Sequence, residues 1–196
     1  MPKSFFGKQL NETNNNYYKE KTMNNGHYNE ITEIGLSKSI SGLYFKSINH
    51  LEREFKKGKE LGDPLSIIIK GDSKLVAPLD SASKEDYVTA LKVACHFLGA
   101  DAIMMFSEGS KWTGTEEERQ FVMEQMGEIH GHVKSEDILI IMIETQGKHI
   151  LGHADVRSSK VGKRREIGKI QWCVMDVPDE SSVRFSNFLP NKGSTQ

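Results

Sequence analysis

The stretch Ile138–Ile143 reads Ile-Leu-Ile-Ile-Met-Ile and is bounded by Asp137 and Glu144. A short apolar run between charged residues is typical of a β-strand. Because no polar residue alternates with the apolar ones, we expect both faces of this strand to be covered. Such a strand lies in the centre of a sheet. The run therefore predicts a layered fold around one buried strand.

Three segments carry the signals of helices. Apolar residues recur at spacings of three and four over 40–55, which gives one apolar stripe. The segment 83–99 begins with Ser83 as an N-cap and ends at Gly99, a common C-terminal stop. A capping box opens a shorter helix over 115–127. We expect two long helices and one short one.

Strand patterns fill the remainder of the chain. A Gly-Asp pair at 71–72 predicts the turn of a β-hairpin, and a Gln-Gly pair at 146–147 predicts a second turn. The strands are expected at 67–69, 75–77, 101–108, 137–144, 148–157 and 165–176, with a loop at 110–115. The last three strands follow one another as an antiparallel meander.

Together these elements predict an α+β fold. We expect a mostly antiparallel sheet of five or six strands, with the two long helices packed on one face and the short third helix beside them. Residues 31–190 should form this single domain. Residues 1–30, which are rich in asparagine, are expected to be a flexible polar arm, and 191–196 a frayed tail.

The composition of the chain limits the partners and the compartment that we expect for the protein. A net charge of −1 gives no overall attraction to nucleic acid or to a membrane. The two cysteines, Cys95 and Cys173, each lie in an apolar run, so they are expected to be small buried residues in a reducing compartment. No signal peptide or membrane span is apparent, and a cytoplasmic location is expected.

Four histidines fall in 130–153, which raises the question of a metal site. His130 and His132 are two residues apart, so on a strand both rings point to one face. His149 and His153 would be about 13 Å apart on a strand, too far to share one ion, whereas His153 and Asp155 could share one. The candidate ligands are therefore His130, His132, His153 and Asp155. Alternation would place one set of side chains on a single face of this strand, which is also typical of a strand with one wet face and no metal: His149, Leu151, His153, Asp155 and Arg157.

Charge is unevenly distributed along the chain. Residues 101–145 hold ten acidic and three basic side chains, whereas 146–171 hold seven basic and two acidic ones. The basic residues concentrate in one predicted turn, with no aromatic residue among them for base stacking. They are candidates for contact with an anion or a partner: Arg157, Lys160, Lys163, Arg164 and Arg165. A solvated hairpin tip would look the same.

One part of the chain resembles a known group of proteins. The sequence GADAIMMFSEGSKW, followed by a histidine-containing loop and the strand DILIIMIE, is similar to a group of uncharacterised phage and bacterial proteins. The residues that carry the resemblance are Ser107, Glu108, Trp112, His130 or His132, and Ile138–Glu144. The resemblance implies no known activity.

The motifs of the common enzyme classes are missing from the sequence, and no cofactor is expected. We therefore expect a small, soluble, non-enzymatic binding or regulatory protein, encoded by a phage, that engages a host protein or a nucleic-acid complex through charged surface patches. Self-association is compatible with the uneven charge. One alternative is a metal-dependent hydrolase acting on a nucleotide or phosphodiester through the four candidate ligands. The other is an assembly component that docks through the N-terminal arm.

Overall fold

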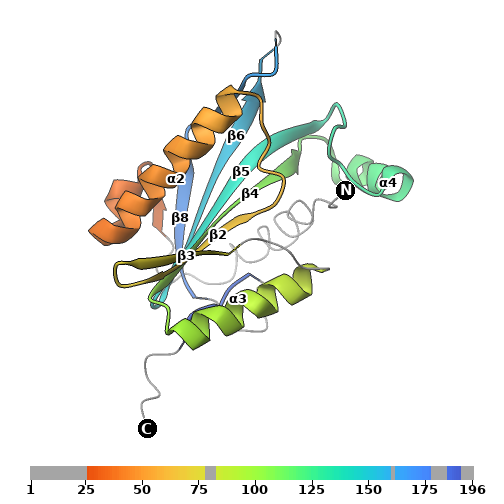
Figure 1. Cartoon of the computed structure of the whole chain (residues 1–196). Helices are drawn as coiled ribbons and strands as arrows, with labels where there is room; N and C mark the ends of the chain where they lie inside the picture. The colour runs from red at the N-terminus through yellow and green to blue at the C-terminus, as the bar shows by residue number, and fades with distance from the viewer. Residues whose placement is uncertain (1–25, 78–82, 160–161, 178–184, 191–196) are drawn as a thin grey trace.

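The computed structural model describes residues 26–77, 83–159, 162–177 and 185–190. These residues form one antiparallel sheet with helices on both faces (Figure 1). The strands are β1 (Gly26–Tyr28), β2 (Leu65–Lys70), β3 (Ser73–Ala77), β4 (Ala102–Trp112), β5 (Ser135–Thr145), β6 (Lys148–Ser158), β7 (Arg165–Ile167) and β8 (Gln171–Asp176). The helices are a 3₁₀ turn η1 (Ile31–Ile34), α2 (Lys38–Lys56), α3 (Lys84–Leu98) and α4 (Glu116–Met126).

The sheet runs in the order β1-β8-β6-β5-β4-β2-β3, and β7 pairs with β6 beside this path. The α+β class and the antiparallel sheet are confirmed. The predicted number of strands is wrong, because the described residues form eight. The predicted strand at 165–176 divides into β7 and β8, and Gly26–Tyr28, inside the range assigned to the arm, pair with β8.

Ile138–Ile143 lie in β5, between β4 and β6 and in the middle of the sheet. All six side chains are buried, as the uninterrupted apolar run predicts. The register places Leu139, Ile141 and Ile143 on one face of the sheet, and Ile138, Ile140 and Met142 on the other. Two apolar faces need two covering layers.

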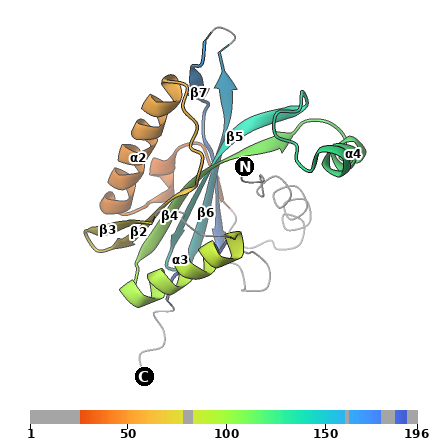
Figure 2. The same cartoon turned by 45° about the vertical axis from the view of Figure 1, so that its right-hand side comes forward.

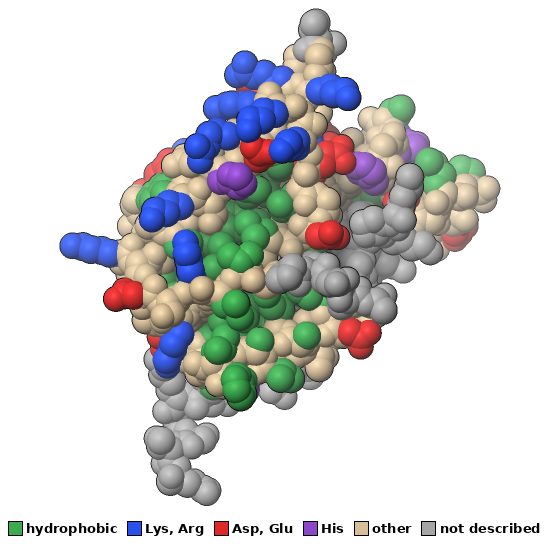
Figure 3. Space-filling model, in the orientation of Figure 1, with side chains coloured by type: hydrophobic (Ala, Val, Ile, Leu, Met, Phe, Trp, Pro, Cys, Tyr) green, Lys and Arg blue, Asp and Glu red, His purple; other side chains and the backbone are tan. Residues whose placement is uncertain are grey.

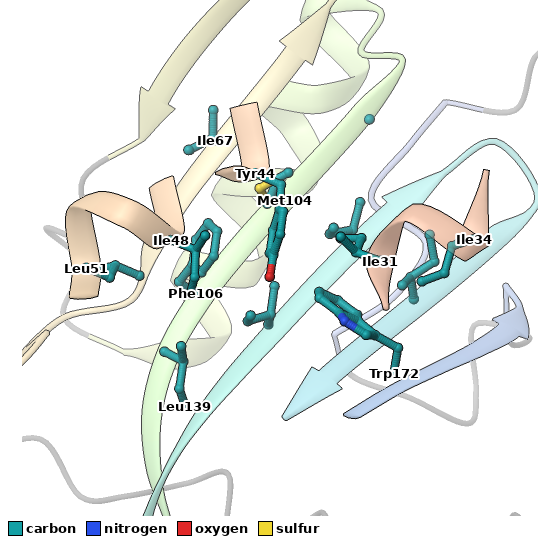
Figure 4. Packing of buried hydrophobic residues seen from close by; sticks show 14 of the residues in the cluster. Ile31, Ile34, Tyr44, Ile48, Leu51, Ile67, Met104, Phe106, Leu139 and Trp172 are labelled. Atoms are coloured by element: carbon teal, nitrogen blue, oxygen red, sulfur yellow. The ribbon is translucent and has the colours of Figure 1, made fainter. Parts of the chain in front are cut away.

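Each face receives one of the two long helices (Figures 1 and 2). On one face, Ile48, Leu51 and Phe55 of α2 pack in a cluster with Met104, Phe106 and Leu139 of the central strands (Figure 4). On the other face, α3 packs in a second cluster, made with Tyr87, Val88, Leu91 and Cys95 of the helix and Ile68, Ile103, Met105 and Met142 of the sheet. The prediction that both helices cover one face is therefore wrong.

Local signals fix where the helices begin and end. The Ser83 hydroxyl accepts a hydrogen bond from the amide of Asp86, and Gly99 ends α3 in the left-handed region at φ 59°. Thr115 and Glu118 form the predicted capping box of α4. The loop predicted at 110–115 begins later than expected, because β4 continues through Trp112. Among the described residues, no helix is both long and apolar enough to cross a membrane.

The segment 185–190 covers the end of β5 and β6 on the α3 face. Phe188 is buried, and its amide and that of Leu189 donate to the same Glu144 oxygen, Oε1, at 2.8 and 3.2 Å. The other Glu144 oxygen, Oε2, lies 3.6 Å from Nδ1 of the buried His149. The prediction that His149 lies on a wet strand face is therefore wrong, since this segment and α3 cover that end of the sheet.

We expect Glu144→Ala to lower the free energy of unfolding by about 2–4 kcal/mol, because two buried amides lose their acceptor and His149 loses its neighbour. Urea denaturation would measure the change, and hydrogen exchange should show faster exchange of the Phe188 and Leu189 amides. The control is Glu136→Ala on the same strand, whose carboxylate is exposed beside Lys111. An equal loss in both variants would contradict this role for Glu144.

Candidate functional site

A cluster of charged side chains lies on the α2 face of the sheet, centred on Arg165 of β7. Arg165 is only 6% exposed. Its Nη1 donates to Glu108 Oε1 at 2.8 Å and to the carbonyl of Lys59 at 3.3 Å, and its Nη2 donates to Asp137 Oδ2 at 3.3 Å. The guanidinium also lies 4.9 Å from the centre of the Phe55 ring. One buried cation therefore joins the end of α2 to three strands.

The strand register explains why the two carboxylates meet. Glu108 pairs with Leu139, and Ser110 pairs with Asp137, so Glu108 and Asp137 lie diagonally on neighbouring strands and on the same face. Burial raises the pKa of Glu108, and the hydrogen bond and charge of Arg165 oppose that effect. Because two carboxylates share one guanidinium, loss of that guanidinium would leave both without their main partner.

His130 extends the cluster toward solvent without forming a catalytic triad. Its Nδ1 lies 3.0 Å from the Ser110 hydroxyl and 3.7 Å from Asp137 Oδ1. In a serine triad the hydroxyl and the carboxylate contact opposite ring nitrogens, whereas here both approach the same nitrogen. Ser110 is also buried. Cys95 is no nucleophile either, because burial raises the pKa of its thiol to about 12, with Glu144 adding to the effect.

The four candidate metal ligands are divided between the two faces of the sheet. His130 lies beside Ser110 and Asp137 on the α2 face, and the His132 ring packs 5.0 Å from that of Trp112. His153 and Asp155 are on the opposite face, where Asp155 pairs with Lys111 at 3.2 Å. Partial removal of the His153 ring from water lowers its pKa, aided by Lys111 and opposed by Asp155.

Within the described residues, no group of three or more histidine, cysteine, aspartate or glutamate side chains is arranged to hold a metal ion. His130, His132, His153 and Asp155 therefore do not surround a common point. The hairpin register is the reason, since it pairs His153 with Ile140, whose side chain is on the α3 face. The sequence alone does not fix that register.

The basic turn divides into a buried and an exposed part. Arg165 is buried as described, whereas Arg157, Lys163 and Arg164 are exposed. Lys160 lies outside the described residues. The turn packs against the end of α2, where Gly58 has φ 79° and a Cβ added to it would lie 2.4 Å from the Lys163 carbonyl oxygen. Only glycine allows this close approach.

This contact creates one surface from two distant parts of the chain, which we call the basic surface: Lys56, Lys57, Lys59, Lys163 and Arg164. Figure 3 shows Lys and Arg side chains gathered at this end of α2 and beside the β6–β7 connection. Sequence reasoning identified Lys163 and Arg164 and missed the contribution of the three lysines. The available signal was Gly58 among lysines at a helix end.

Three carboxylates lie among these five cations. Glu52 pairs with Lys56 at 3.9 Å, Glu166 pairs with Arg164 at 2.8 Å, and Glu54 pairs with both Lys57 and Lys59. The hydrogen bonds from the two lysines lower the pKa of Glu54 to about 2, so this carboxylate stays ionised at neutral pH. The surface keeps a positive excess of two charges, and four of its five cations form exposed ion pairs with these carboxylates.

A pocket of about 260 Å³ opens on the basic surface. It is lined by Glu52, Lys56, Arg164, Glu166 and Ile167. A lining of two acids, two bases and one apolar side chain suits a group that carries both polar and apolar parts. Acidic residues gather elsewhere, at α4, which begins with Glu116, Glu117 and Glu118 and lies across the molecule from α2 (Figures 1 and 2).

Comparison of this chain with family models, with curated proteins and with solved structures gives no match. The candidate sites are therefore defined by geometry alone.

Removal of the buried Arg165 guanidinium should destabilise the folded state. We expect Arg165→Ala to lower the free energy of unfolding by about 2–4 kcal/mol, because Glu108 and Asp137 are left partly buried without a guanidinium. The control is its neighbour Arg164→Ala, whose ion pair is exposed and whose loss should change stability by less than about 0.5 kcal/mol. Urea denaturation of both variants would measure the two losses in free energy of unfolding. Similar losses for the two arginines would contradict the role of Arg165 as a buried partner of Glu108 and Asp137.

The raised pKa of Glu108 predicts a pH dependence. A carboxyl group whose pKa is higher in the folded state contributes most stability below its unfolded value of about 4.5, and that contribution falls as pH rises through the folded value. We therefore expect the stability of the wild type relative to Glu108→Gln to decrease from about pH 4 to about pH 7. Urea denaturation at both pH values would measure it. An increase over this range would contradict the prediction.

Proposed function

We propose that this chain is a binding protein that engages an acidic surface of a partner protein through its basic surface. The observation that carries the proposal is the contact between the end of α2 and the β6–β7 connection, which brings five cations from two segments together. Charge complementarity of this kind steers association and selects the partner. The regulatory role and the phage origin remain predictions from the sequence.

The composition of the basic surface favours a protein over a nucleic acid. Glu52, Glu54 and Glu166 lie among its cations and would repel the continuous phosphates of a nucleic acid. Among the described residues that line the pocket, none is aromatic, so they offer no platform for base stacking. A protein surface with mixed charges can instead match both signs, and the Ile167 side chain in the pocket can take an apolar group.

The connection that carries Lys163 and Arg164 is anchored at the neighbouring Arg165. Arg165 lies directly after Arg164 in the chain, and its hydrogen bonds to Glu108 and to the Lys59 carbonyl tie the connection to the sheet and to the end of α2. A backbone anchored in this way loses less conformational entropy on binding than a free loop. The buried cluster therefore supports binding without touching the partner.

The two alternatives receive less support. A hydrolase that holds a metal ion through His130, His132, His153 and Asp155 requires ligands that here lie on opposite faces of the sheet. Docking through the N-terminal arm, predicted at residues 1–30, depends mainly on residues 1–25, which lie outside the described part of the chain.

The test is charge reversal in Lys163→Glu/Arg164→Glu. The probes are a labelled poly-glutamate peptide, a labelled DNA duplex and a single-stranded RNA, each followed by fluorescence anisotropy at low salt. We expect the double variant to bind the acidic peptide at least about tenfold more weakly, because two attractive contacts become repulsive. Raising the salt concentration should weaken the wild type in the same direction.

The matched control is Lys38→Glu/Lys46→Glu, which makes the same change of net charge with exposed lysines of α2 outside the basic surface. It should retain most of the affinity. Equal losses in the two double variants would show that net charge alone is responsible and would contradict the proposal. Tighter binding of DNA or RNA than of the acidic peptide would assign the surface to nucleic acid instead.

A further inference from the structure

Exposed apolar side chains gather at the end of the sheet formed by β3 and along the neighbouring helix α3. Figure 3 shows hydrophobic side chains over β2, β3 and α3 in the lower half of the view. We call this the apolar edge surface and define it by its large exposed residues: Leu75, Val76, Val93, Phe97 and Leu98. Phe97 is 89% exposed and Val93 is 63% exposed. These values are unusual for large apolar residues and need an explanation.

The helical period places part of α3 beside β3. Lys92 lies over the Phe188 ring, so that side of α3 faces the segment 185–190. Residues 94 and 98 lie on the opposite side of the helix, since each residue turns the helix by about 100°. Ala94 packs in the same cluster as Ala77 of β3. Leu98 and Phe97 therefore continue along the helix the apolar surface that Leu75 forms on the α3 face of β3, whereas Val76, which pairs with Ile67, lies on the α2 face of the same edge.

β3 presents a free backbone edge. Among the described residues it pairs with β2 alone. The backbone amide of Asp101 donates to the Ile69 carbonyl at 2.8 Å, so the main-chain groups of Ile69 face β4. The main-chain groups of successive residues point to alternate sides of a strand. The amide and carbonyl of Ile68 therefore face β3 and form hydrogen bonds with Leu75, the residue opposite. The amides and carbonyls of Lys74 and Val76 therefore point away from the sheet.

We propose that this edge is the interface between two copies of the chain, joined by antiparallel pairing of β3 with β3 of the partner subunit about a two-fold axis at Leu75. In this register the backbone of Lys74 forms hydrogen bonds with that of Val76 of the partner subunit, and Val76 does so with Lys74 of the partner subunit. All four residues whose main-chain groups point away from their own sheets are then hydrogen-bonded. The two Leu75 side chains meet on the α3 face. A shift that places the two Lys74 side chains opposite each other would bring like charges together.

The available area fits a second copy. Phe97, which is 89% exposed, can bury most of the roughly 150–250 Å² of an aromatic side chain, and four smaller apolar side chains that are 39–63% exposed add to that area. A stable interface buries about 800 Å² on each partner. The strand backbone and the polar residues around the patch supply the remainder. The two-fold axis also places this apolar surface against the same surface of the partner subunit.

The interface shares no residue with the basic surface. Its failure would therefore leave the proposed function untouched, and the reverse also holds.

Sedimentation equilibrium of the full chain at micromolar to about 100 µM concentrations is the first measurement. We expect a reversible dimer, and at least a tenfold weaker dimer in Leu75→Asp and in Phe97→Asp. Val133→Asp and Phe121→Asp are matched controls, because both side chains are exposed apolar residues, 93% and 63%, outside the apolar edge surface. A monomer at all concentrations, or equal weakening by the controls, would overturn the proposal.

Cysteine variants test the register. Across a two-fold axis the Leu75 Cα atoms would be about 4.5 Å apart as a non-hydrogen-bonded pair, which lies within the range for a disulfide of about 4.4–6.8 Å. Leu75→Cys should therefore form a disulfide-linked dimer under mild oxidation. Lys74→Cys should not, since it faces Val76 of the partner subunit. Cys95 and Cys173 are both buried and stay out of the reaction. A dimer in which Leu75→Cys fails to cross-link would also overturn the proposal.

Discussion

The need to cover both faces of the sheet at its long central strands determines the architecture. β4, β5 and β6 each extend over eleven residues; the middle portions of β4 and β5 are apolar on both sides, and that of β6 is apolar on the α2 face. Burial of that surface is the main favourable contribution to folding, and it requires one layer on each face. α2 supplies one layer, and α3 with the segment 185–190 supplies the other.

The charged cluster around Arg165 is the polar exception within this arrangement. It lies where the cover provided by α2 ends, and it replaces apolar packing with hydrogen bonds among Arg165, Glu108 and Asp137. Buried ion pairs add little net stability, but they strongly penalise arrangements in which the charges are separated. The cluster therefore fixes the position of β7 relative to α2, and with it the geometry of the basic surface.

Local features of the fold could be predicted from the sequence. The run Ile138–Ile143, the cap at Ser83 and the stop at Gly99 each depend on nearby residues, and the structure confirms them. Features that depend on distant residues could not be predicted. The burial of Arg165 depends on Glu108 and Asp137, which lie 57 and 28 residues away. The faces occupied by His130 and His153 depend on strand register, which spacing along the chain leaves undetermined.

The docking of the C-terminal segment has a consequence for the order of events during biosynthesis. The amides that satisfy Glu144 belong to residues 44 and 45 positions later. At typical rates of translation these residues are made a few seconds after Glu144. During that interval a β5–β6 hairpin that has already formed must keep the Glu144 carboxylate in contact with water. The end of the sheet that holds Glu144 and His149 therefore closes only after this late segment has been made, whereas the centre of the sheet has no such delay.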